Sequence, residues 1–220
     1  PSLVLLYVCR IYDMKQPYVM ADVVSNLAKD ALFANSRLDV LVVGDGPDLN
    51  PLKKYMGERV QSDFVKVHFM GEQPESTVRE IMNIADIVFL PSVSEGISLV
   101  MLETMASGRV FVGAKVGGQP EAISADCRCG VLVDQGTPQE EVARYSRIIL
   151  RLLGNAAERE AMGKAARQRI LDKFDSRNLA RCFEDSFTVA AKNRVPNTLS
   201  ERAARQWNTF AMEYFSGEYA

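Results

Sequence analysis

Short apolar stretches that alternate with longer helical patterns place the strongest limit on how this chain can fold. Residues 3–9, 38–44 and 86–90 have the length and apolar composition of strands buried on both faces. Between them, as over residues 17–33, apolar side chains recur at the spacing of one helix face. We therefore predict an α/β fold with a Rossmann-like, doubly wound parallel sheet, whose ligands bind at the carboxyl ends of the strands.

The same alternation continues to about residue 133, after which the pattern is helical throughout. Further strands are predicted over 64–70, 109–113 and 130–133, and further helices over 47–60, 75–84, 98–106, 120–123, 138–153, 156–173 and 176–192. A break at Val195–Asn197 precedes an amphipathic stretch with four aromatic residues, Trp207, Phe210, Tyr214 and Phe215. We predict one domain over residues 1–195 and a helical C-terminal tail over 196–220.

Composition excludes several classes of protein. Apolar residues make up 47% and charged residues 25% of the 220 residues, as in ordinary globular proteins. A net charge of −2 argues against nucleic acid as a partner. No apolar run approaches the ~18 residues of a membrane span, so no transmembrane segment is predicted. We expect a cytoplasmic or cytosol-facing protein, with peripheral membrane association left open.

The cysteines do not form a pattern that binds metal. The chain has four, Cys9, Cys127, Cys129 and Cys182, none of them in a C-x-x-C pair, and only one histidine, His68, to accompany them. A zinc site would therefore lack ligands. We expect four reduced thiols.

The segment from Pro91 to Ile123 carries the most chemical information. It starts where a strand ends and holds Glu95 and Glu103, separated by seven residues. If a helix begins near residue 98, the carboxylates lie roughly 10 Å apart along it, which suits the two ends of an extended ligand. The open helix N-terminus between them favours an anion such as a diphosphate. The amides that would face this anion belong to Gly96, Ile97, Ser98 and Leu99.

This segment resembles the E-x7-E signature of the retaining GT-B glycosyltransferases of the group 1 family. The matching residues are Pro91-Ser92, Glu95-Gly96, Ser98, Leu102-Glu103, Met105-Ala106, Gly108, Gly117-Gly118 and Glu121, with departures at Ile97, Thr104 and Val110. Four other segments are similar to the family pattern: Arg10-x4-Lys15, Val43–Pro47, Phe69–Gly71, and Ala85-Asp86 with the apolar run that follows it. Gln16 stands where the family has a glycine after the lysine. The resemblance covers about residues 3–190.

The resemblance implies a role for each matching residue. Glu95 would contact hydroxyls of the transferred sugar and stabilise a developing oxocarbenium-like centre, and Glu103 would accept the ribose hydroxyls. Arg10 and Lys15 would neutralise the donor diphosphate. Backbone groups of Gly71 and Glu72 would meet the base, while Gly117 and Gly118 would either frame the sugar pocket or only form a turn. No D-x-D motif stands at a strand end, so neither a metal nor any other cofactor is expected.

The resemblance also implies what the whole protein does. The chain would be the C-terminal, donor-binding half of a retaining transferase that uses a nucleotide diphosphate sugar. The acceptor-binding N-terminal domain, absent from this chain, or a partner chain would complete it, and the chain alone would be inactive. One alternative is a non-catalytic structural or interaction subunit derived from a glycosyltransferase. Less favoured are a sugar-nucleotide epimerase, which would lack this helix start, and NAD binding at Gly44-x-Gly46, where the third glycine is Leu49.

Overall fold

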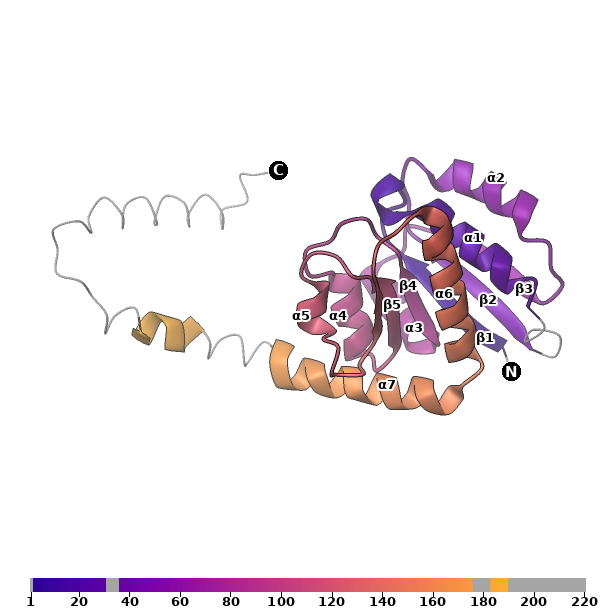
Figure 1. The fold of residues 1–220 in the computed structure, drawn as a ribbon. Coiled ribbons are helices and arrows are strands. Elements are labelled where there is room, and N and C mark those ends of the chain that lie inside the picture. The colour runs from indigo at the N-terminus through magenta and orange to yellow at the C-terminus, as the bar shows by residue number, and fades with distance from the viewer. Residues whose placement is uncertain (1, 31–35, 176–182, 190–220) are drawn as a thin grey trace. The chain divides into compact units, whose positions relative to one another are not determined.

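Six parallel strands form one sheet in the order β3-β2-β1-β4-β5-β6 (Figure 1). The computed structural model describes residues 2–30, 36–175 and 183–189. The strands are β1 (Ser2–Val8), β2 (Arg37–Val43), β3 (Val65–Gly71), β4 (Ile87–Leu90), β5 (Val110–Ala114) and β6 (Val131–Val133). The order reverses between β1 and β4, where a doubly wound sheet leaves an opening for ligands. The predicted fold class is confirmed.

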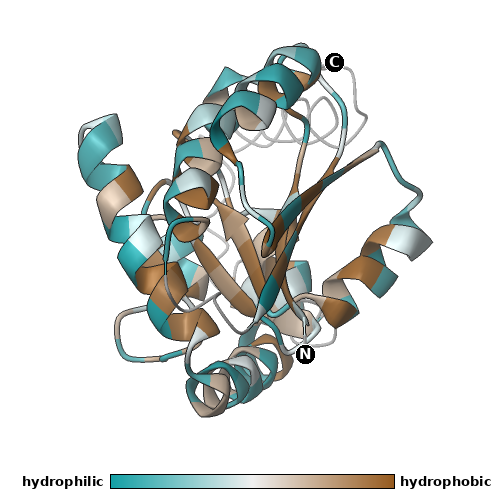
Figure 2. Cartoon of the chain, turned by 90° about the vertical axis from the view of Figure 1, so that its right-hand side faces the viewer, coloured by the Kyte–Doolittle hydropathy of each residue, from teal (hydrophilic) through white to brown (hydrophobic). Residues whose placement is uncertain are grey.

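The connecting helices follow the predicted order closely. They are α1 (Pro17–Leu27), α2 (Leu49–Arg59), α3 (Glu75–Ile84), α4 (Leu99–Ala106), α5 (Gln119–Ala122), α6 (Pro138–Leu153) and α7 (Ala156–Arg169). Helix α1 packs against α2 and α6, while α7 lies across α4 and α6. Figure 2 shows the apolar strands enclosed between helices with hydrophilic outer sides. Each amphipathic helix buries its apolar side on the sheet because this removes that side from water.

The core is densest around the central strands. Every residue of β4 and β5 is buried, as are the last four of β1. The Phe89 ring of β4 packs on Tyr145 of α6, with ring centroids 4.9 Å apart. Helix α6 starts with a capping box in which Thr137 and Glu140 exchange side-chain and backbone hydrogen bonds. The ring contact fixes α6 against the carboxyl end of β4, where the candidate site lies.

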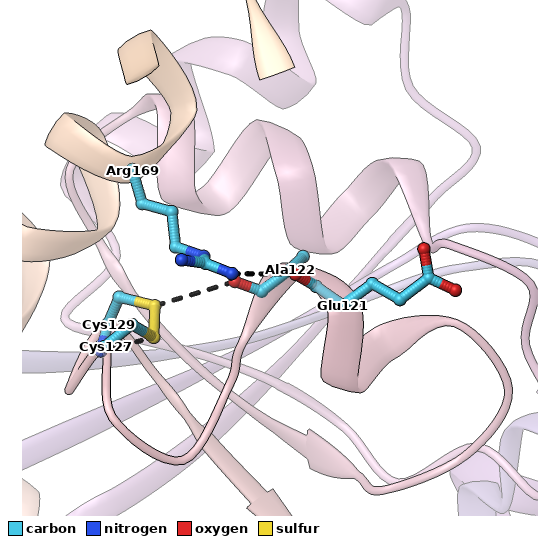
Figure 3. Close-up of a disulfide and its surroundings, with 5 residues drawn as sticks. All are labelled: Glu121, Ala122, Cys127, Cys129 and Arg169. Atoms are coloured by element: carbon cyan, nitrogen blue, oxygen red, sulfur yellow. Dashed lines mark hydrogen bonds between the residues drawn. A yellow bond between two sulfur atoms is a disulfide. The ribbon is translucent and has the colours of Figure 1, made fainter. Parts of the chain in front are cut away.

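Three arginines of α7 bind carbonyls at the C-terminal ends of other helices. Arg159 donates to Leu152 and Leu153 at the end of α6, each at 2.7 Å. Arg167 donates to Ala106, the last residue of α4, at 2.7 Å. Arg169 donates to the Glu121 and Ala122 carbonyls of α5 (Figure 3). A cation at a helix C-terminus satisfies free carbonyls and opposes the helix dipole, so α7 fastens three helices at once.

A hollow of about 610 Å³ opens at the amino ends of β4 and β5, far from the predicted ligand edge. Its basic lining includes Arg109, Arg159 and Arg167. These side chains already donate to backbone carbonyls, since Arg109 binds the Asn83 carbonyl at the end of α3. We therefore assign these three arginines to helix capping, whereas Lys164, which also lines the hollow, pairs with Glu160.

The structure contradicts one prediction about the cysteines. Cys127 and Cys129 form a disulfide, with their Cα atoms 5.1 Å apart (Figure 3). The physical reason is the residue between them, because Arg128 has a φ of 48° and turns the chain so that both side chains meet. Among the described residues, Cys9 is the free cysteine; Cys182 lies outside them.

The end of the chain is only partly described. The residues from Pro1 to Phe174 form one compact unit. Of the helix predicted over 176–192, residues 183–189 are described and are helical. The predicted tail over 196–220, with its aromatic residues, lies outside the described residues. No helix within the described ranges is long and apolar enough to cross a membrane.

Candidate functional site

The site centres on an ion pair between two loops at the carboxyl edge of the sheet. Lys15 lies in a short 3-10 turn after β1, and Glu95 lies in the loop after β4. Strands β1 and β4 are parallel neighbours, so these loops meet although the residues are 80 positions apart. Lys15 Nζ is 2.5 Å from Glu95 Oε1, and the side chains are 17% and 11% exposed. The structure thus brings together two residues that the sequence predicted for one site.

A backbone hydrogen bond joins these two loops, and a side chain of β1 holds the turn that carries Lys15. The Val93 amide donates to the Met14 carbonyl at 2.8 Å. The Tyr7 hydroxyl donates to the Lys15 carbonyl at 3.0 Å. Gln16, which follows the lysine, is left-handed with φ 49° and ψ 54°. Such a conformation costs a non-glycine residue of order 1–3 kcal/mol, so the surrounding contacts must fix it.

The N-terminus of α4 lies directly after Glu95 and is open to an anion. Ser98 caps the helix, its hydroxyl accepting the Met101 amide at 3.4 Å, and its carbonyl accepts the Leu102 amide at 3.1 Å. The amides of Leu99 and Val100 therefore have no acceptor within the helix. These amides and the positive end of the helix dipole favour a phosphate group. The predicted helix start at about residue 98 is confirmed.

Gly117 and Gly118 pack directly on the loop that carries Glu95. The Gly118 amide donates to the Gly96 carbonyl at 3.1 Å. A Cβ atom added to Gly117, whose φ is 52°, would lie 1.7 Å from the Glu95 carbonyl oxygen. Only glycine fits there. The pair therefore supports the Glu95 loop, whatever contact it makes with a ligand.

A hollow of about 720 Å³ opens over the carboxyl ends of β1 and β2, and its lining includes neither Lys15 nor Glu95. Two predicted site residues, Arg10 and Glu72, line it, and Val100 of α4 closes one side. Gly71 ends β3, and its carbonyl accepts the Gly44 amide at 2.7 Å. The arrangement offers room for a flat base near β2 and for phosphates near the start of α4.

Glu103 stands apart from the Lys15–Glu95 pair, as its spacing predicted. It lies on α4 and is exposed. The pKa of its carboxyl is raised above the ordinary value, first by partial loss of water around it and then by the nearby carboxylate of Glu75. Arg79 acts in the opposite direction. The two motif carboxylates therefore have different charged neighbours.

Several residues of the hollow were not predicted from the sequence. Besides Val43–Pro47, which had matched a family pattern, they are Val8, Cys9, Gln73, Val78 and Val100. Their shared signal is their position at a strand end or the first turn of a helix, which is where this fold binds ligands. Burial raises the pKa of the Cys9 thiol to about 12, although Tyr7 and Lys15 oppose the rise. The thiol is thus protonated at neutral pH and unsuited to act as a nucleophile.

Metal binding was not predicted, and the described residues provide little for it. Within residues 2–30, 36–175 and 183–189, no three metal-ligating side chains gather closely enough to hold an ion. The cations at the carboxyl edge of the sheet include Arg10, which lines the hollow, and Lys15, which pairs with Glu95. Such a set can bind a diphosphate without an ion.

Comparison with known proteins decides the family. Residues 1–169 match the model of the family described as "Glycosyl transferases group 1". This chain is a member of that family. It is 32% identical over 167 residues to a D-inositol 3-phosphate glycosyltransferase of Streptosporangium roseum, covering 74% of this chain and 37% of the relative. It is 28% identical over 181 residues to an N-acetyl-alpha-D-glucosaminyl L-malate synthase of Bacillus anthracis, covering 82% and 44%.

Solved structures of glycosyltransferases share the fold. The pneumococcal O-GlcNAc transferase GtfA, in complex with UDP and GlcNAc, aligns with a TM-score of 0.69 at 18% identity, over 84% of this chain and 35% of that one. HepE of Anabaena, in complex with UDP-glucose, aligns with a TM-score of 0.69 at 19% identity, over 86% and 49%. The chain therefore spans less than half the length of these relatives.

Proposed function

We propose that this chain is the donor-binding half of a retaining glycosyltransferase that takes its sugar from a nucleotide diphosphate sugar. The observation that carries the proposal is the Lys15–Glu95 pair, which joins a cation to a carboxylate four residues ahead of Leu99, the first residue of α4. A diphosphate needs the cation and the amides, and the sugar beyond it needs the carboxylate. Membership of the group 1 glycosyltransferase family supports this use of the site.

Each part of the donor has a place in the proposed complex. Lys15 and Arg10 neutralise the diphosphate together with the α4 amides, so no metal is required. Glu95 binds sugar hydroxyls and stabilises positive charge on the anomeric carbon as the leaving group departs. Glu103 accepts the ribose hydroxyls. The base occupies the hollow over β2, next to backbone groups of Gly71 and Glu72.

Transfer requires a second domain that binds the acceptor. Val93, Ile97 and Leu99, around the start of α4, are 38%, 39% and 71% exposed, so apolar surface borders the site. An acceptor-binding domain covering this border would bury that surface and exclude water from the reacting sugar. Retention would then proceed on one face of the sugar through a short-lived ion pair, with Glu95 beside it. The chain alone should bind the nucleotide and transfer nothing.

Calorimetric titration of the chain with UDP, GDP and ADP tests this proposal. UDP is the first probe because two structures with this fold hold it or its sugar conjugate. We expect one nucleotide to bind and, at 100 times its Kd, to stabilise the fold by about 2.7 kcal/mol. If neither this chain nor a longer protein containing it binds any of the three, the non-catalytic subunit is the better explanation.

Glu103→Gln should separate affinity from stability. A raised pKa means that the ionised carboxyl is less favourable in the folded than in the unfolded protein, so this group opposes folding once the pH has risen through its pKa. Neutral glutamine removes that opposition, and the free protein should melt at the same or a higher temperature at pH 7. Nucleotide affinity should nevertheless fall by about 10-fold or more, because hydrogen bonds to a charged acceptor are lost. Unchanged affinity would remove Glu103 from the ribose site.

A further inference from the structure

Gln16 makes an unusual pair of contacts immediately after Lys15. Its backbone is left-handed, and the next residue, Pro17, restricts that backbone further. With its amide oriented toward the acceptors around it, its side-chain nitrogen donates to the Pro91 carbonyl at 3.0 Å and to Glu141 Oε2 at 2.9 Å. A strained residue with two well-formed hydrogen bonds is held there by its surroundings.

The Glu141 side chain, which accepts one of these hydrogen bonds, is held in place by its own burial and contacts. Glu141 lies on α6 and is only 4% exposed. Its other carboxylate oxygen, Oε1, accepts the Gly136 amide at 2.9 Å. A buried carboxylate is costly without such donors, so both contacts resist disruption. The same segment contacts the Glu95 loop a second time, because Gln135 Nε2 donates to the Val93 carbonyl at 2.9 Å.

The hydrogen bond to Pro91 matters because of where Pro91 lies in the chain. Pro91 is the first residue after β4 and begins the loop that leads to Glu95, while Gln16 ends the loop that carries Lys15. One amide therefore fastens both loops to each other and to α6. Without it, the two loops would be joined by the Val93–Met14 backbone contact and by the ion pair itself.

We propose that Gln16 is a positioning residue that fixes Lys15 against Glu95 and thereby sets how strongly the site holds the second phosphate of the donor. This inference rests on the proposed function. Gln16 acts through Lys15 and does not touch the donor. A glycine would reach the same backbone conformation without strain but would leave Pro91 and Glu141 without their donor.

Two variants distinguish the effect of the Gln16 side-chain amide from the effect of its backbone strain. Gln16→Met keeps the length of the side chain and the left-handed strain but removes the amide. Gln16→Gly removes both the amide and the strain. We expect each to lower UDP affinity by about 5-fold or more while changing UMP affinity less than about 2-fold, since UMP lacks the second phosphate. A purely structural role would lower the melting temperature and leave the ratio of UDP to UMP affinity unchanged in both variants, which would overturn the inference.

Lysine acetylation read by peptide mass spectrometry tests the same inference without a nucleotide. In the wild-type protein Lys15 is 17% exposed and paired, whereas Lys164 is 76% exposed beside Glu160 on α7. We expect Gln16→Met to speed acetylation of Lys15 several-fold and that of Lys164 not at all. Equal rates at Lys15 in both proteins would overturn the inference. If neither the wild-type chain nor a longer protein containing it binds UDP, GDP or ADP, the proposed function fails, and the acetylation rates alone decide the role of Gln16.

Discussion

Lys15→Ala should weaken UDP binding about 10- to 100-fold, because a charge-assisted hydrogen bond to phosphate is worth about 1.5–3 kcal/mol. Glu95→Gln should do the opposite and leave UDP affinity equal or up to about 10-fold higher. In the free protein, Glu95 Oε1 lies 2.5 Å from Lys15 Nζ and pairs with this cation. Its carboxylate competes with the diphosphate for the cation and repels it. Calorimetry of both variants with UDP measures the two effects.

A matched control makes the contrast specific. Lys164 also pairs with a glutamate, Glu160, but lies on α7 at the other end of the molecule. Lys164→Ala should leave UDP affinity unchanged. Equal losses from Lys15→Ala and Glu95→Gln would contradict the prediction, because they would mean that the pair acts only as a structural contact. In a longer protein with acceptor domain, Glu95→Gln should reduce sugar transfer despite its intact UDP binding.

The two single variants should also differ in stability. Lys15→Ala leaves a carboxylate that is only 11% exposed without its cation. Loss of one partner of a fully buried pair costs about 3–5 kcal/mol, and partial hydration of this pair reduces the expected loss to about 1–2 kcal/mol. Glu95→Gln keeps a neutral acceptor for Lys15 and should cost less. Urea unfolding at neutral pH distinguishes these values.

Local sequence patterns were enough to predict the sheet and the main chemical motif. The strands of the core are apolar at nearly every position, so their periodicity differs clearly from that of the helices. Strand β4 is followed at once by the Glu95 loop and then by α4, whose start at Leu99 lies one residue from the predicted start. The family resemblance placed Lys15 and Glu95 in one site, and their contact is possible because the carboxyl ends of parallel strands share one edge of a sheet.

The contacts that refine the site could not be predicted in this way. Gln16 contacts Glu141, 125 positions later in the chain, and only the packing of α1 against α6 brings them together. The Cys127–Cys129 disulfide depends on the left-handed conformation of Arg128, which no local pattern indicated. The helix-capping arginines of α7 look like ordinary surface charges in the sequence. Each case depends on tertiary geometry, which single-residue propensities do not encode.

Gly117→Ala should be among the most damaging single substitutions in the chain. An added Cβ would lie 1.7 Å from the Glu95 carbonyl oxygen, and the backbone there has a φ of 52°. The variant therefore combines left-handed strain with a clash against backbone, and we expect a loss of about 3–4 kcal/mol of unfolding free energy. Urea unfolding followed by circular dichroism measures it. UDP affinity of the folded fraction should also fall, because the Glu95 loop must move.

Gly71→Ala separates strain from clash. Gly71 has a φ of 67°, but a Cβ added there would meet nothing within 4 Å. The variant should therefore lose only the unfolding free energy that left-handed strain costs, about 1–2 kcal/mol. The difference between the two variants measures what close packing of Gly117 on the Glu95 loop contributes. If both variants lose the same free energy, the loop can yield to the added methyl group, and the glycine pair is a turn rather than a support for Glu95.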